Sequence, residues 1–246
     1  MSKPSTSTGK AASAKPQRLE PLTETLQLGA RAYRALANGI VSGQIEAGIQ
    51  LRPDTIAEQL AISVTPVREA LHRLEGDGLL VKLPYQGWFV REFTEPEVRQ
   101  LYEIRADMEC LGVRLACQRM TPEEVAWLRE QQVIGKEAIA SNDIDAYRLY
   151  NRDLHAAITR GARNSYLSSI MGQLSLQSQM LMGRTIRLVG RPSRAIEEHE
   201  ELIELIAKKQ DKRAQQLMER HIFSALEDII RFAIVEPGQM PRRPAK

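Results

Sequence analysis

The stretch that decides the fold is Ser63–Leu74, which reads SVTPVREALHRL. The Thr65 hydroxyl can cap a helix that starts here, and Pro66 then takes the first helical position, where its missing N–H costs nothing. The apolar residues that recur at helical spacing are Val67, Ala70, Leu71 and Leu74. Arg68 and the other polar residues fall on the opposite side. The stretch therefore predicts a capped amphipathic helix with outward-facing arginines.

A second short helix is expected directly upstream, over Asp54–Leu60, with Asp54 as its cap. Ala61 and Ile62 leave room for only a tight turn between the two helices. A short helix, a tight turn and a capped second helix are typical of a helix-turn-helix, whose second helix fits a DNA major groove. The alternative is an ordinary two-helix corner.

The residues that follow favour the first interpretation. Gly76 and Gly78 end the helix, and Leu79–Leu83 and Trp88–Arg91 predict two short strands. The turn between them holds Pro84, Tyr85, Gln86 and Gly87. A hairpin with a glycine near its tip is a β-wing that can approach a phosphate closely.

The runs SVTPVREALHRLEGDGLL and LPYQGWFV resemble the winged helix of the GntR family of bacterial transcription regulators. The resemblance implies double-stranded DNA as a partner. The expected DNA-binding residues are Arg52, Ser63, Thr65, Arg68, His72 and Gly87. Val64 stands where the family usually has arginine, so one DNA contact is missing or replaced here.

Composition and cysteine usage point to a cytoplasmic protein. The chain has 246 residues, of which 43% are hydrophobic, with no apolar run long enough to span a bilayer and no secretory signal pattern. Cys110 and Cys117 lie two turns apart on one expected helix, roughly 10 Å by the helical rise. That separation is too large for a disulfide, so both thiols are expected to be reduced.

The net charge of +3 lies entirely in the N-terminal part. Residues 1–91 contain 11 Lys and Arg against 8 Asp and Glu, whereas residues 92–246 contain 23 of each. This small excess of positive charge agrees with DNA binding by the first part.

Four regions are expected along the chain: a disordered arm over 1–24, a winged helix over 25–92, an all-helical domain over 95–235 and a tail over 236–246. Thr94 and Glu97 form a capping box at the start of the helical domain. Start signals predict helices over 95–119, 122–140, about 142–161, 164–188, from 192 onward, and 211–235. Short connections between antiparallel helices indicate a bundle, so the fold class is mainly α.

Three of the four histidines lie on apolar stripes of three different bundle helices. His155 lies on the same stripe as Asn151, one turn earlier. His199 and His221 each stand at a position of their own helix where the spacing calls for an apolar residue. Neutral imidazole is a common ligand of divalent transition metals, and an amide oxygen can complete such a set. The pattern predicts a metal site, and a hydrogen-bonded polar core is the alternative.

The segments YEIRADME, NRDLH, EEH and MERH resemble the FCD domain, the helical effector domain of the FadR subfamily of GntR regulators. The resemblance implies a divalent metal, Zn, Ni or Mn, held by Asn151, His155, His199 and His221. Members of the subfamily have Asp or Asn at the first position. A neutral amide donates less charge than a carboxylate, so we expect weaker metal binding here.

A metal with open positions could hold a small carboxylate or sugar acid, with an arginine binding its far end. Arg105 and Arg184 are the candidates. The apolar stripe expected beside Arg105 comprises Leu101, Ile104, Met108 and Leu115. The alternative role of Arg105 is a helix-surface salt bridge with Glu109.

Together these features predict a dimeric transcription regulator, not an enzyme, that binds a pseudo-palindromic operator under the control of a small organic acid. One rival is a metal-dependent hydrolytic enzyme. Asp153 and Glu198 adjoin the proposed ligands in sequence, but helical geometry predicts that they project elsewhere. The other rival is an architectural DNA-binding protein with a purely structural metal.

Overall fold

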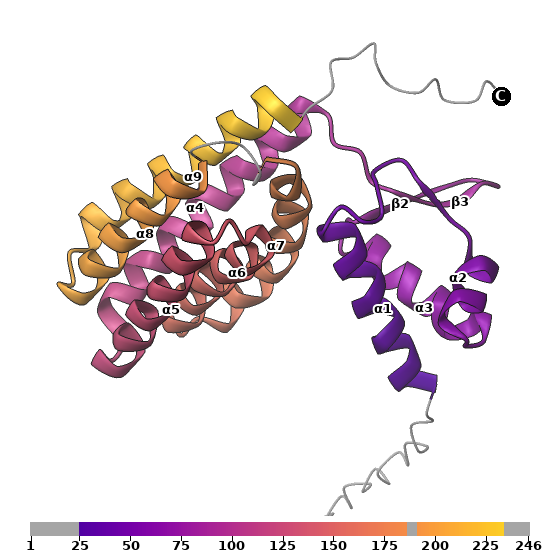
Figure 1. Ribbon diagram of the computed structural model, residues 1–246, viewed down its shortest axis with the longest axis horizontal. Helices are drawn as coiled ribbons and strands as arrows, with labels where there is room; N and C mark the ends of the chain where they lie inside the picture. The colour runs from indigo at the N-terminus through magenta and orange to yellow at the C-terminus, as the bar shows by residue number, and fades with distance from the viewer. Residues whose placement is uncertain (1–24, 186–190, 234–246) are drawn as a thin grey trace, which may run out of the picture.

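The computed structural model describes residues 25–185 and 191–233, and these form a small N-terminal part and a larger all-helical part (Figure 1). The N-terminal part is a winged helix-turn-helix, and the second part is an antiparallel helical bundle. The predicted mainly α fold class is therefore confirmed. The arm predicted over 1–24 and the tail predicted over 236–246 lie outside the described residues.

The winged helix begins with helix α1 and ends with a small antiparallel sheet. Its elements are α1 (Thr25–Val41), β1 (Gln50–Leu51), α2 (Pro53–Leu60), α3 (Val64–Gly76), β2 (Leu80–Leu83) and β3 (Gly87–Val90). The strand order is β1-β3-β2. The two predicted strands are confirmed within a residue, whereas β1, with only two residues, is too short to show an alternating pattern.

Both predicted caps of the helix-turn-helix are wrong by two residues. α3 begins at Val64 after an extended Ser63, so Thr65 lies in the first turn instead of capping it. Pro66 is tolerated there because the first N–H groups of a helix have no intrahelical partner. α2 begins at Pro53 after Arg52, which places Asp54 in its first turn, where a carboxylate favours the helix dipole.

The helical bundle comprises six helices in the described residues. They are α4 (Glu95–Arg119), α5 (Pro122–Ala140), α6 (Ile144–Gly161), α7 (Ser165–Thr185), α8 (Arg191–Ala207) and α9 (Asp211–Ala233). The capping box at Thr94 is confirmed, since the Glu97 carboxylate accepts a 2.8 Å hydrogen bond from the Thr94 N–H. α6 begins at Ile144, two residues later than predicted, and is capped by Asp143, whose carboxylate accepts from the Ala146 N–H.

The buried surface of α4 is wider than the predicted stripe. Leu115 is buried, and Leu101 and Met108 pack against core clusters, as predicted. Ile104, the remaining residue of the stripe, is 53% exposed, whereas Val98 and Tyr102 are fully buried. α4 packs against α6, α7, α8 and α9, so a wide surface of this helix is covered. The covered surface therefore extends beyond the apolar stripe and includes Arg105 and Glu109, which lie in the interior of the bundle.

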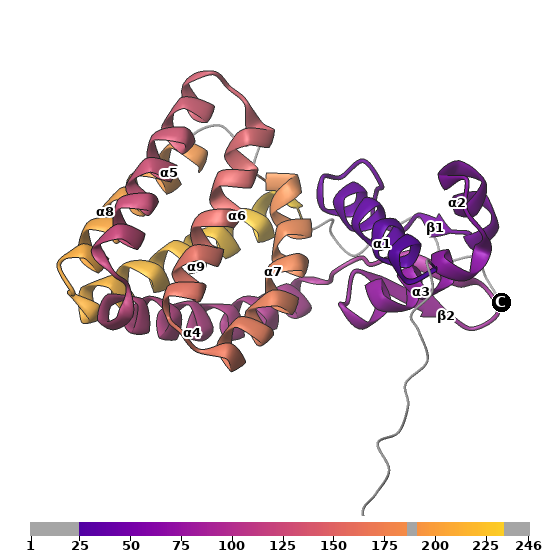
Figure 2. The same cartoon turned by 90° about the horizontal axis from the view of Figure 1, so that it is seen from below.

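α7 lies nearest to the winged helix, beside α1, in both views of the molecule (Figures 1 and 2). Met180 of α7 is buried in the core of the winged helix, among residues of α1 and α3. The two parts of the protein are therefore joined by packing as well as by the chain.

Cys110 and Cys117 are both free, as predicted. Over the described stretches, no helix is both long enough and apolar enough to cross a bilayer.

Candidate functional site

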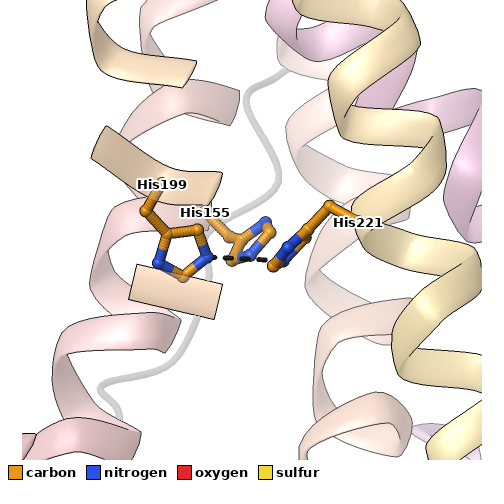
Figure 3. A group of neighbouring side chains, drawn as sticks. All are labelled: His155, His199 and His221. Atoms are coloured by element: carbon orange, nitrogen blue, oxygen red, sulfur yellow. Dashed lines mark hydrogen bonds between the residues drawn. The ribbon is translucent and has the colours of Figure 1, made fainter. Parts of the chain in front are cut away.

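Three histidines from three helices meet inside the bundle (Figure 3). His155 comes from α6, His199 from α8 and His221 from α9, and their exposed fractions are 6%, 0% and 4%. One ring nitrogen from each lies within 4.8 Å of the other two. The convergence predicted from the three apolar stripes is thus present in the structure.

The orientation of His199 is fixed by a chain of buried hydrogen bonds. The Gln132 amide N–H donates to the Ile196 carbonyl at 2.7 Å, which leaves the amide oxygen to accept from the Tyr150 hydroxyl. Because the Tyr150 hydroxyl proton is donated to Gln132, the Tyr150 oxygen accepts a hydrogen bond from His199 Nδ1 at 3.1 Å. This chain assigns the His199 proton to Nδ1 and leaves its Nε2 with a lone pair.

Carboxylates stand behind the other two histidines. Glu198 Oε2 lies 2.6 Å from His221 Nδ1, and Glu109 Oε1 lies 3.1 Å from His155 Nδ1. A carboxylate can only accept, so it favours a proton on the Nδ1 that faces it. The expectation that Glu198 projects away from the site was wrong: α8 and α9 pack together, which brings Glu198 behind a histidine of the neighbouring helix. Asp153 pairs with Arg152 at 2.8 Å instead.

The Nε2 atoms of His199 and His221 face each other beside His155. His199 Nε2 and His221 Nε2 lie 3.3 Å apart, close to the separation of two imidazole nitrogens bound at about 2.0–2.1 Å to one tetrahedral metal. Both ring nitrogens of His155 are buried without a hydrogen bond of good geometry among the described residues, although Nδ1 lies 3.1 Å from Glu109 Oε1. Without an ion the facing nitrogens of His199 and His221 share one proton in an N–H···N hydrogen bond, whereas a cation that replaced the proton would accept the lone pairs of both rings. The residues present therefore fit a divalent metal bound through Nε2 atoms.

Arg105 and Glu109 form a buried ion pair beside the histidines. Arg105 lies 3.4 Å from Glu109 Oε1, and it also contacts the Tyr102 hydroxyl. Burial raises the pKa of the Glu109 carboxyl, but His155 and Arg105 outweigh this and hold the pKa well below its ordinary value. The salt bridge with Glu109 that was the alternative role of Arg105 is present, but it lies in the interior of the bundle and not on the helix surface.

A cavity of about 280 Å³ opens next to this cluster, between α6 and α7. Its floor includes His155 and Glu109, and Arg152 and Arg160 line its walls. Apolar and hydroxyl side chains complete the lining, among them Met171, Leu176, Thr159, Ser168 and Ser175. Polar groups converging on a concave, largely apolar surface are typical of a small-molecule site.

The other residues predicted for the metal and effector sites do not line this cavity in the described part of the chain. Asn151 is buried on α6, one turn before His155, where an oxygen ligand was expected. Arg105 is not among the residues that line the cavity. The side chain of Arg184 lies outside the described part of the chain.

The predicted DNA-binding residues lie at the surface of the winged helix. Arg52, Ser63, Thr65, Arg68 and His72 are exposed. Thr65, Arg68 and His72 follow one another at helical spacing on α3, and Gly87 sits at the wing with φ +90°. Tyr85 at the wing tip is fully exposed, and the Gln50 amide donates to the Gln86 carbonyl at 2.5 Å, which braces this turn.

Sequence reasoning missed several partners of the histidines: Glu109 as a buried group, Gln132, Tyr150 and Glu198. A signal existed for Gln132, since it continues the inward stripe of Val125 and Leu128 on α5. A polar residue on such a stripe needs a buried partner. Glu198 is half-buried and carried no comparable signal, because its contact crosses from α8 to α9.

Comparison with protein families matches both parts of the chain. The family described as "Bacterial regulatory proteins, gntR family" matches residues 28–90, and the FCD domain matches residues 100–224. The chain belongs to the GntR family. The FCD match places it with the members that carry a helical effector domain, and it is a transcription regulator of this family.

Named relatives agree with this assignment of the GntR-family chain. It is 31% identical over 203 residues to the Nta operon transcriptional regulator of Aminobacter aminovorans, covering 80% of this chain and 93% of the relative. It is 27% identical over 202 residues to the HTH-type transcriptional repressor GlaR of Escherichia coli, covering 79% and 92%. The solved structure of E. coli McbR/YncC shares the fold, with a TM-score of 0.75, 23% identity, and coverage of 83% of this chain and 97% of that one.

Proposed function

We propose that this GntR-family regulator binds a pseudo-palindromic operator as a homodimer and is controlled by a small carboxylate or sugar acid held at a divalent metal in the FCD domain. His155, His199 and His221 would bind the metal, and Asn151 would supply an oxygen ligand. When bound, the metal offers open coordination positions to an anionic oxygen. The effector then favours one arrangement of the bundle and changes the affinity for DNA.

The observation that carries this proposal is the meeting of three buried histidines from three helices, with the Nε2 atoms of His199 and His221 3.3 Å apart. Tyr150, Glu198 and Glu109 hold the outer nitrogens, which is the usual way in which a protein orients metal-binding histidines. A purely hydrogen-bonded polar core would pair His155 Nε2, which has no partner in the described part of the chain.

The neighbouring cavity supports an anionic effector. Arg152 and Arg160 line it, and His155 forms part of its floor, so one anion could reach from a guanidinium toward the metal. Arg152 and Arg160 are better placed for this than Arg105, because Arg105 does not line the cavity and its guanidinium is buried against Glu109. Arg152 also pairs with Asp153, so Arg160 is the better candidate of the two. Arg105 would act by holding Glu109 against His155.

Thermal unfolding with metal and chelator tests the proposal. We expect Zn²⁺, Ni²⁺ or Mn²⁺ to raise the Tm of metal-free protein, with one ion bound per chain. A metal present at 100 times its Kd stabilises by about 2.7 kcal/mol. Small carboxylates and sugar acids would then add a further rise in Tm that disappears with chelator. If elemental analysis finds none of these ions bound to the protein, the proposal is contradicted.

For the DNA side we expect that Arg68→Ala abolishes specific operator binding. Arg68 is exposed on α3 between Thr65 and His72, where a guanidinium reaches base edges or phosphate, and one such contact contributes about 1–3 kcal/mol. The measurement is footprinting on a duplex that the wild-type protein selects from a random library. Arg34→Ala, an exposed arginine of α1, serves as the control with the same loss of charge. A retained footprint for Arg68→Ala would disprove this role.

The rival activities have less support. A metal-dependent hydrolase needs a general base facing the metal-bound water, but Glu198 and Glu109 face the outer Nδ1 atoms of the histidines. An architectural DNA-binding protein with a structural metal would show no effect of any small acid on DNA affinity.

A further inference from the structure

α7 belongs to two binding surfaces at once. On one side, Met171, Ser175 and Leu176 line the cavity beside His155. On the adjoining side, Leu176 and Met180 pack into the core of the winged helix. Leu176 takes part in both, so a group that enters the cavity contacts a side chain that also packs against the DNA-binding part.

The contact continues directly after helix α3, whose residues are expected to enter the major groove. Gln177 Nε2 donates to the carbonyl of Asp77, the residue that ends α3, at 3.1 Å. A Cβ on the next residue, Gly78, would lie 2.5 Å from Gln177 Nε2. α7 therefore packs tightly against the turn between α3 and β2.

Asp77 also ties this turn to α1. Its carboxylate accepts a 2.6 Å hydrogen bond from the Tyr33 hydroxyl, and Arg73 lies 4.1 Å from the centre of the Tyr33 ring. Further along α7, a Cβ on Gly183 would lie 2.8 Å from the Val41 carbonyl at the end of α1. One face of α7 thus contacts both α1 and the end of α3.

We propose that α7 is the element through which the effector cavity controls the winged helix: a ligand that moves α7 shifts the α3–β2 turn through Leu176, Gln177 and Met180. This proposal rests on the proposed function for the role of the cavity. A helix is rigid along its length, and packed interfaces change between discrete arrangements, so a small displacement at the cavity reaches the turn. The turn moves with α3, and the fit of α3 to DNA changes with it.

A tethered group can take the place of the unidentified ligand. Gly172 is exposed at the edge of the cavity, and a Cβ added there meets nothing within 4 Å, so Gly172→Leu places an isobutyl group at the cavity mouth. Gly172→Ala is the baseline, because it matches the gain in helix propensity without filling the space. Gln173→Leu is the control: Gln173 is exposed on α7 and is not part of the cavity lining.

The readouts are hydrogen exchange of the Asp77, Gly78 and Leu79 amides, which are hydrogen bonded to the end of α3, and the Kd for the library-selected duplex. We expect Gly172→Leu to change both at least fivefold, the lower end of typical allosteric coupling. Gly172→Ala and Gln173→Leu should change either by less than twofold. Adding Gln177→Ala to Gly172→Leu should reduce the effect to less than twofold.

Changes confined to α6 and α7, with the turn and the Kd unaltered, would overturn the proposal. If Gly172→Leu does not fold, Ser175→Met fills the same cavity from the next turn of α7 and gives the same test. The protein is kept metal-free throughout, so a failure of the relay leaves the metal titration untouched, and a failure to bind metal leaves this test valid.

Discussion

His199→Ala is expected to lose metal binding, with an affinity reduced by more than 100-fold. His199 is fully buried, and its Nε2 lies 3.3 Å from that of His221, so no other described side chain is placed to supply this ligand. Removal of a residue that only hydrogen bonds to a metal ligand already lowers metal affinity 10–100-fold, and loss of the ligand itself should lower it further. Isothermal titration with Zn²⁺, followed by elemental analysis of the dialysed protein, measures the effect.

The chain supplies its own control in His72, the remaining histidine, which is exposed on α3 in the winged helix. His72→Ala should bind metal as the wild type does. Asn151→Asp should act in the opposite direction to His199→Ala, because a carboxylate donates more charge than an amide. Metal stoichiometry that is unchanged in His199→Ala would contradict the assignment of the site.

Glu109→Gln is expected to lower the free energy of unfolding of the metal-free protein by about 3–5 kcal/mol, because it leaves a buried arginine without its counter-charge. The Glu109 and Arg105 side chains are 1% and 6% exposed, and His155 faces the same carboxylate. Urea denaturation followed by circular dichroism measures the change. Arg105→Met with Glu109→Gln together should recover part of the loss, since the unpaired charge is removed.

α4 offers a matched pair for this comparison. Glu95 and Arg99 have the same spacing on the same helix, but their side chains are 46% and 44% exposed. Glu95→Gln should change the free energy of unfolding by about 0.5 kcal/mol or less. If Glu109→Gln and Glu95→Gln lower the free energy of unfolding equally, the Arg105–Glu109 pair contributes no more than an exposed pair, which contradicts the prediction.

The sequence predicted most elements of the fold because their signals are local. Thr94, Pro96 and Glu97 mark the start of α4, and the alternating residues and glycines mark the wing. The convergence of the three histidines was predictable as well. Each one replaces an apolar residue at helical spacing, and three inward stripes of one bundle share one centre.

What the sequence did not reveal depends on contacts between helices. The burial of Tyr102, Ala106 and Arg105 on α4 was missed because a helix covered on several sides has no single apolar stripe. Glu198 behind His221, and Gln132 behind Tyr150, are contacts between residues far apart in the chain. The position of α7 against the winged helix is of the same kind.

The depth of the three histidines has a kinetic consequence. His155 lines the open cavity, whereas His199 and His221 are 0% and 4% exposed, so an ion would reach the site through the cavity or when the helices part briefly. An acid that fills the cavity would close the first of these routes. Exchange of the ion would then be slower with the acid bound than without it, so the acid would also set how long the ion stays.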